Sequence, residues 1–361
     1  MAQGTNVLLV NLSAIASTNA AAINMTDAQL VSTAVNTAAA NRLVVGPLKV
    51  NQVEALAGAT DVGGMCTDYS GNIYFTDVTN HCIVKVTESG VTSIVAGKAG
   101  TSGNNTAKQN VLASAARFNA PRGIACDKSN NLYVADTANN QIRIISQNGL
   151  VGMLAGNGSR TAGLVDASQD PTQAQFSAPY GVAVDNSGIV WIADRGNRAL
   201  RKIAGGKVIT LAGNGSAASS SKQNVAANNH TALFGTLGPN CIAVDAKQNV
   251  FLSDIAFFQI KKFTPDGWIY LHSGSTQGTS LGTATTTVAK SQTCQYEGII
   301  SLAADRYGYV WALDVSGSNK RVVRVSPGGI PGNVVDFSNT TYTPRAIAVS
   351  PAGKIFVALV K

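Results

Sequence analysis

An aspartate that recurs about every 59 residues constrains the fold of this chain more than any other feature. It ends a short apolar run and opens a tight turn in five copies, which are Asp68, Asp127, Asp185, Asp245 and Asp305. A second aspartate ends the next apolar run and recurs in step, as Asp77, Asp136, Asp194, Asp254 and Asp314. A long period with about four β-rich runs per unit predicts radial repetition, and therefore a β-propeller with one blade per repeat.

Residues 180–215 show one complete unit of this repeat. Residues 181–184 and 189–193 are apolar runs on either side of an Asp-Asn-Ser-Gly turn, and a Gly-Gly pair separates a further two runs at 200–203 and 208–211. Short β-branched runs interrupted by Gly, Asn and Asp are typical of β-hairpins. The unit therefore predicts two successive hairpins, which give four strands per blade.

The sixth copy of the repeat is split between the two ends of the chain. Residues 345–361 contain only the first two strands, with Ser350 in place of the aspartate. Residues 47–58, PLKVNQVEALAG, parallel the second hairpin of the complete unit. We therefore expect a sixth blade with inner strands from the C-terminus and outer strands from residues 46–60. Such closure removes open sheet edges.

Two repeats, DNSGIVWIADRGNRALRKI and DKSNNLYVADTANNQIRII, resemble NHL repeats, whose pattern is roughly GIAVD-x-x-G-N-x-Y-V-A-D-x-x-N-x-R-I. The tails MLAGNGS and TLAGNGS, each followed by a polar loop and F-x-A-P, resemble the long-loop bacterial form of that family. The resemblance extends over residues 46–361 and implies an all-β, six-bladed propeller. It implies no single function, because the family includes binding modules, lyases and sensors.

Residues 1–45 lie outside the repeat. Residues 6–14 are a candidate strand, and Thr26-Asp27-Ala28-Gln29 resembles a capping box before an Ala-rich stretch that predicts a helix to about residue 40. We expect an N-terminal arm over residues 1–45, which packs on the propeller or on a partner, and an NHL-like propeller over residues 46–361. The alternative for the arm is a disordered tail.

The charge pattern argues against nucleic acid as a partner. The net charge is +8, but the cationic residues are dispersed and form no basic stripe. Only 13% of the residues are charged, which suits a surface covered by neighbours. The first 26 residues contain no Lys or Arg, and no apolar run reaches membrane-spanning length. We therefore expect synthesis in the cytoplasm without a signal peptide and without a membrane span.

The sequence shows no catalytic or metal-binding constellation. His81, His230 and His272 lack ligand spacing, and no Gly-x-Ser-x-Gly elbow is present. The second aspartate of each repeat is expected to fix its turn by accepting backbone N–H bonds. The inner strands offer almost nothing polar for calcium. We therefore expect no catalytic residue, no metal and no cofactor.

Insertions of about 20 residues separate the blades, at 98–121, 158–179, 215–239 and 275–298. Because strands alternate in direction, all four emerge on the face opposite the Asp-x-x-Gly turns; we call it the loop face. This face carries more cations than acids, and the fourth blade has two aromatic residues where the others have a polar turn. The candidate partner-binding residues are Lys98, Arg122, Arg160, Arg195, Arg198, Phe257 and Phe258.

These features favour a non-enzymatic structural or interaction protein. We expect a β-propeller subunit of a large assembly, specifically a bacteriophage virion component such as a capsid decoration or tail appendage protein, located in the virion. Its partners would be other protein subunits, bound through the arm or one propeller face, or an acidic or glycan surface. The alternatives are a propeller lyase or lactonase, which predicts a bound divalent cation, and a sensor or adhesin that binds glycan or peptide on the loop face.

Overall fold

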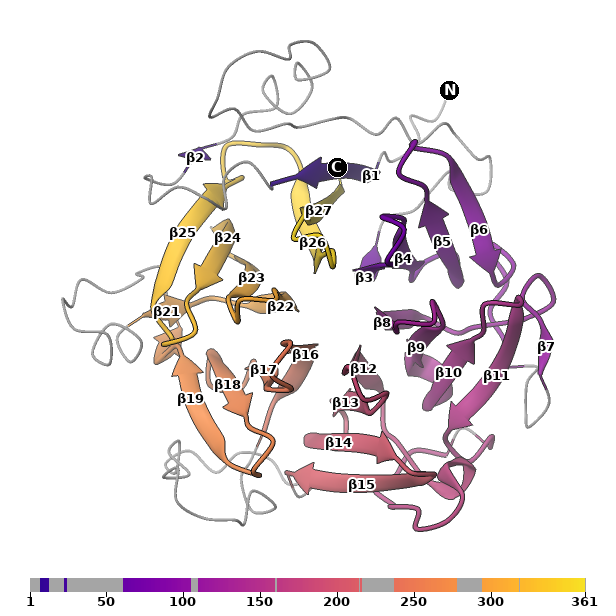
Figure 1. Ribbon diagram of the computed structural model, residues 1–361. Helices are drawn as coiled ribbons and strands as arrows, with labels where there is room; N and C mark the ends of the chain where they lie inside the picture. The colour runs from indigo at the N-terminus through magenta and orange to yellow at the C-terminus, as the bar shows by residue number, and fades with distance from the viewer. Residues whose placement is uncertain are drawn as a thin grey trace.

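The computed structural model has six blade sheets around a central axis in the described part of the chain, and a seventh, two-stranded sheet lies outside the blades (Figure 1). Those residues are 7–12, 23–24, 61–104, 110–159, 161–213, 215, 237–277, 294–317 and 319–360. Each of the six blade sheets is built from antiparallel hairpins that lead from the centre outward. The fold is therefore the all-β, six-bladed propeller that the repeat predicts.

Five blades follow one another along the chain. Blade one contains β3 (Val62–Thr67), β4 (Ile73–Asp77), β5 (Cys82–Val86) and β6 (Thr92–Ala96). Blade two contains β8 (Pro121–Cys126), β9 (Leu132–Asp136), the 3-10 helix η2 (Thr137–Asn139), β10 (Gln141–Ile145) and β11 (Leu150–Ala155), with β7 (Val111–Leu112) at its outer edge. The 3-10 helix η3 (Pro171–Gln173) precedes blade three, which contains β12 (Pro179–Val184), β13 (Val190–Asp194), β14 (Ala199–Ala204) and β15 (Lys207–Ala212).

The next two blades have the same order. Blade four contains β16 (Pro239–Val244), β17 (Val250–Asp254), β18 (Gln259–Phe263) and β19 (Ile269–Ser273). A parallel pair, β20 (Thr276–Gln277) and β21 (Gln295–Tyr296), follows it. Blade five contains β22 (Ile299–Ala304), β23 (Val310–Ser316), β24 (Asn319–Val325) and β25 (Pro331–Asp336).

The two ends of the chain share the closing blade, as expected, but the N-terminal strand is a different one. The described strands of this blade are β26 (Thr343–Val349), β27 (Ile355–Val360) and β1 (Val7–Asn11). β1 runs antiparallel to β27, from the pair Val7–Val360 to the pair Asn11–Phe356. The prediction that residues 46–60 supply the strand beside β27 is therefore wrong. Those residues lie outside the described part of the chain.

The burial of β1 explains this choice of strand. Val7 and Leu9 pack into the apolar core shared with blade one, whereas Val10 packs into the core shared with blade five. The apolar run VLLV suits a strand that is buried on both faces. The candidate strand within residues 6–14 is thus part of the propeller.

A second N-terminal piece pairs with the propeller at its rim. β2 (Ile23–Asn24) runs parallel to β25, the outer strand of blade five. The predicted helix over residues 26–40 lies outside the described residues, and the domain boundary at residue 46 remains a prediction. None of the helices in the described part of the chain has the length and apolarity needed to cross a lipid bilayer.

Small residues let the inner strands approach one another at the narrow centre. A Cβ atom on Gly123 would lie 2.6 Å from the carbonyl oxygen of Tyr180, and one on Gly181 would lie 2.9 Å from that of Asn240. Alanine recurs in the inner strands as buried Ala125, Ala183, Ala243, Ala303 and Ala348. The high share of Gly and Ala therefore follows from how closely the inner strands pack.

Candidate functional site

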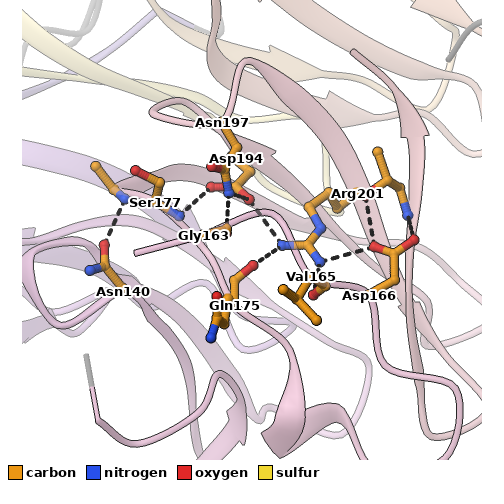
Figure 2. Close-up of polar contacts among 11 residues, drawn as sticks. Asn140, Gly163, Val165, Asp166, Gln175, Ser177, Asp194, Asn197 and Arg201 are labelled. Atoms are coloured by element: carbon orange, nitrogen blue, oxygen red, sulfur yellow. Dashed lines mark hydrogen bonds and ion pairs between the residues drawn. The ribbon is translucent and has the colours of Figure 1, made fainter. Parts of the chain in front are cut away.

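The second aspartate of each repeat is buried and occupied by structural hydrogen bonds. Asp194 Oδ1 accepts the backbone N–H of Ser177 at 2.9 Å, and Oδ2 accepts from Asn197 Nδ2 at 2.8 Å and Arg201 Nη1 at 3.1 Å (Figure 2). Arg201 also donates to the carbonyl oxygens of Gln175 and Val165, and pairs with Asp166 at 3.0 Å. The network ties the preceding insertion to blade three. Asp194 holds its own turn through the Asn197 side chain, and the backbone N–H that it accepts comes from Ser177 in the insertion instead of from the turn.

Three other blades repeat this carboxylate–cation pair. The pairs are Asp136–Arg143 at 3.1 Å, Asp254–Lys261 at 2.7 Å and Asp314–Arg321 at 2.7 Å. Burial raises the pKa of Asp136 and Asp194 to about 6, although the paired arginines act in the opposite direction. Blade one has Val84 at the position of the cation. Because these carboxylates are committed to internal contacts, they are structural groups.

A cavity of about 340 Å³ opens on the axis at the face of the Asp-x-x-Gly turns; we call it the axial pocket. It is formed by the C-terminal halves of all six inner strands and by the turns that follow them. One residue from each inner strand marks its wall: Cys66, Cys126, Val184, Val244, Ala304 and Val349. These six side chains are apolar or thiols, whereas polar groups, which lie where the strands enter their turns, make up the larger part of the exposed lining.

The first aspartate of each repeat caps its own turn at this face. Asp245 Oδ1, for example, accepts the backbone N–H groups of Lys247 and Asn249, both at 2.9 Å. In blades one and two the other carboxylate oxygen is also filled by two donors. Its donors are Asn72 Nδ2 and Tyr74 Oη for Asp68, and Asn131 Nδ2 and Tyr133 Oη for Asp127.

Asp185, Asp245 and Asp305 differ from Asp68 and Asp127 in the number of donors to Oδ2. They are also the three first aspartates that line the axial pocket. Among the described residues, a single side chain donates to each Oδ2: Trp191 to Asp185 at 3.1 Å, Asn249 to Asp245 at 2.7 Å, and Trp311 to Asp305 at 3.3 Å. A carboxylate oxygen has two lone pairs. Three consecutive blades thus each offer one open acceptor to a molecule in the pocket.

The described residues do not fit a divalent cation. Among them, no group of three or more His, Cys, Asp or Glu side chains is placed to hold a metal ion. The pocket thiols are also poor nucleophiles, because burial raises the pKa of Cys66 and raises that of Cys126 to about 12. The axial pocket therefore supplies shape, apolar walls and hydrogen-bond acceptors.

The histidines do not form a site in the described part of the chain. His81 Nδ1 accepts the backbone N–H of Ala120 at 3.0 Å, and His230 lies outside the described residues. His272 in β19 is buried, and its ring centroid lies 4.9 Å from that of Phe251. Burial, with a smaller effect of Lys262, lowers the pKa of His272 to about 4. The two described histidines thus have structural contacts in different blades.

Because the His272 imidazole is buried, we expect the propeller to lose stability at low pH. His272 is neutral in the folded protein, whereas the same side chain in the unfolded chain binds a proton below about pH 6.5. The contribution of His272 to the free energy of unfolding is therefore fully present above that pH and is lost toward pH 4. We expect the stability difference between the wild type and His272→Gln to fall by about 3 kcal/mol from pH 7.5 to pH 4. Denaturant unfolding of both proteins at several pH values measures it. A difference that does not change with pH would contradict the buried neutral state.

Two of the expected partner-binding residues meet at one aromatic ring on the loop face. The guanidinium carbons of Arg122 and Arg195 each lie 4.6 Å from the centroid of Tyr180. Lys98 is exposed and Arg198 is half-buried. Arg160 lies outside the described residues. The structure thus brings Arg122 and Arg195 together around Tyr180. Tyr180 was not among the residues expected from the sequence.

The two aromatic residues of the fourth blade turn inward. Phe257 is 9% exposed, and Lys261 Nζ lies 5.0 Å from its ring centroid. Phe258 is half-buried and packs against the apolar core between blades four and five. Both rings are thus largely occupied by contacts within the propeller.

Comparison with known proteins agrees with this architecture. Residues 118–145, which span β8 to β10 of blade two, match the family model described as NHL repeat. The chain is a six-bladed β-propeller, and its second blade contains a segment that matches the NHL repeat. No curated protein matches the sequence.

Solved structures that resemble this propeller include a gluconolactonase from Xanthomonas campestris. It has 13% identity and a TM-score of 0.53, and the match covers 84% of this chain and 87% of that chain. A Bacteroides thetaiotaomicron protein of unknown function has 12% identity, coverage of 85% and 71%, and a TM-score of 0.54. A calcium-binding protein, regucalcin, from Agrobacterium tumefaciens has 13% identity, coverage of 84% and 91%, and a TM-score of 0.50. At these identities the likeness shows the fold.

The expected role as a bacteriophage virion component is wrong. The matching propellers include a gluconolactonase and regucalcin, and they favour the enzyme alternative over a virion subunit. The expectation of a non-enzymatic protein is not confirmed, since these neighbours include an enzyme. The expected protein partners and the virion location gain no support.

Proposed function

We propose that this propeller binds a small hydroxyl- or amine-bearing molecule in the axial pocket. The observation that carries the proposal is the coincidence of the cavity with the three open acceptors on Asp185, Asp245 and Asp305. Each of these Oδ2 atoms accepts one hydrogen bond within the propeller, and its second lone pair can accept another from a hydroxyl or amine on a ligand. The three carboxylates also disfavour an anionic ligand.

The size and walls of the pocket narrow the ligand class. About 340 Å³ lies at the lower end of the range for small-molecule sites, roughly 300–1,000 Å³. Apolar wall residues such as Val184, Val244 and Ala304 suit C–H faces, while the aspartates suit hydroxyl groups at the edge. A monosaccharide or a sugar lactone has both features. Neutral sugars and amino alcohols are therefore the first compounds to test.

A pocket-filling variant tests this proposal. Val244→Phe places a larger side chain in the pocket wall, and Val91→Phe makes the same change at a residue that is 61% exposed, in the turn between β5 and β6. A ligand at 100 times its Kd should stabilise the wild type by about 2.7 kcal/mol, seen as a rise in Tm. We expect Val244→Phe to lose this rise and Val91→Phe to keep it. The same rise in all three proteins would contradict binding in the axial pocket.

A lactonase- or lyase-type enzyme that acts in the same pocket is the second candidate. The likeness to the gluconolactonase at a TM-score of 0.53 favours it. The described pocket residues provide no metal site, so any activity has to be assayed both without and with added divalent cations. Opening of gluconolactone faster than in buffer, and loss of that rate in Val244→Phe, would support the enzyme. A rate equal to that in buffer under both conditions would restrict the pocket to binding.

A further inference from the structure

The loop-face end of the channel has a polar ring of its own. In four inner strands a proline is followed by a residue that lies at this end: Arg122 in β8, Tyr180 in β12, Asn240 in β16 and Arg345 in β26. These positions are at the opposite ends of the strands from the axial pocket. The two ends of the channel thus differ in charge, with three aspartates and Arg306 lining the axial pocket and Arg122 and Arg345 at the loop-face end.

Arg122, Tyr180 and Arg195 form the centre of this second cluster. Both guanidinium carbons lie 4.6 Å from the centroid of the Tyr180 ring. A cation gains electrostatic energy from an aromatic face, and the contact also restricts the arginine side chain. The ring therefore holds two guanidinium groups close together at one place on the loop face.

The positive charge of this cluster is only partly balanced. Arg122 Nη2 lies 3.4 Å from Asp61 Oδ2, and both side chains are partly exposed, at 25% and 32%. Arg195 is exposed, and no carboxylate lies within ion-pair distance of it among the described residues. By contrast, Arg201 in the same blade contacts two carboxylates. One guanidinium charge in the cluster thus has no acidic partner in the described part of the chain.

Two further polar atoms on the same ring of positions are unpaired. Asn240 is 6% exposed, and its Oδ1 atom is buried without a hydrogen-bond partner among the described residues. Arg345 Nε is likewise buried without a partner there. The Asn240 backbone adjoins Gly181, the residue after Tyr180. Buried polar atoms without partners are uncommon in proteins. Arg345 Nε is a donor and suits an oxyanion, whereas Asn240 Oδ1 is an acceptor and suits a hydroxyl or N–H group elsewhere on the ligand.

We propose that the loop-face end of the channel is a second binding site, which holds the carboxylate or phosphate group of a small molecule. Arg122 and Arg195 would donate hydrogen bonds to the oxyanion, since the planar guanidinium matches the geometry of both groups. Tyr180 is the positioning residue that holds the two guanidiniums. The site is separate from the axial pocket, which disfavours anions.

Titration of the full-length chain with inorganic phosphate, and separately with acetate, at constant ionic strength tests this site. Isothermal calorimetry gives the Kd, and NMR of the arginine side chains reports which guanidinium responds. We expect Arg195→Gln to weaken the binding of both anions by about tenfold or more. The matched control is Arg306→Gln, because Arg306 is also exposed and stacks on a tyrosine, Tyr307, at 4.9 Å, but lies at the other face, where it lines the axial pocket. The control should keep the wild-type Kd.

The outcomes separate this site from the axial pocket. Anion binding that Arg195→Gln loses, while Arg306→Gln and Val244→Phe keep it, supports a second site. Equal weakening by Arg195→Gln and Arg306→Gln would mean a diffuse response to charge and would overturn the proposal. Absence of binding by the wild type would overturn it too. Failure of the sugar experiment in the axial pocket would leave this result unaffected.

Discussion

Replacement of Arg201 by methionine is expected to lower the free energy of unfolding by about 3–5 kcal/mol. The Arg201 side chain is fully buried, and its removal leaves the buried carboxylate of Asp194 without its cation. The carbonyl groups of Val165 and Gln175 lose their donor as well, so the insertion before blade three loses its attachment (Figure 2). Denaturant unfolding at pH 7 measures the change.

Two further variants make this result interpretable. Lys354→Met removes the lysine of the exposed pair with Glu88, whose side chains are 46% and 64% exposed, and should leave the unfolding midpoint unchanged. Asp194→Asn on the Arg201→Met background should recover part of the loss, because it removes the unpaired charge. If Arg201→Met lowers the free energy of unfolding no more than Lys354→Met does, the buried Asp194–Arg201 pair does not stabilise the blade as described.

The second large effect is expected for Gly123→Ala, which should cost about 3 kcal/mol, at the upper end for overpacking. The new Cβ would lie 2.6 Å from the carbonyl oxygen of Tyr180 and 2.7 Å from the backbone nitrogen of Val182. Both atoms belong to the backbone of β12, which the closed ring prevents from moving away.

Gly332→Ala in β25 is the matched control, since the nearest atom to its Cβ would be a carbonyl oxygen 3.9 Å away. It should be neutral or slightly stabilising, because glycine is unfavourable inside a strand. Thermal and denaturant unfolding of both variants give the comparison. Equal stability of Gly123→Ala and Gly332→Ala would show that the inner strands are less tightly packed than the structure indicates.

The repeat was sufficient to predict the blades, but not which N-terminal segment closes the ring. Similarity to a hairpin pointed to residues 47–58, whereas β1 is the strand that packs into the cores on both faces of the closing blade. Periodicity reports how a strand aligns with other repeats. It does not report how much apolar surface a segment outside the repeats can bury, and β1 lies outside the repeats.

The axial pocket was missed because its aspartates look alike in the sequence. What distinguishes them is the residue types four and six positions after each aspartate. After Asp68 these are Asn72 and Tyr74, which both donate to its second carboxylate oxygen. Asp185 and Asp305 lack the Asn, and Asp245 has Phe251 in place of the Tyr. The pattern of donors around each aspartate therefore carries the information, whereas the aspartate alone does not. The role of Tyr180 was missed for a similar reason, because an aromatic residue in a strand is ordinary.

The most direct test of the central claim is a crystal structure of the full chain with the sugar or amino alcohol that gives the largest rise in Tm. Binding in the axial pocket predicts electron density on the axis, with ligand donors within about 3.2 Å of Oδ2 of Asp185, Asp245 or Asp305. Ligand density elsewhere on the propeller, with the axial pocket free of ligand at saturating concentration, would contradict the account.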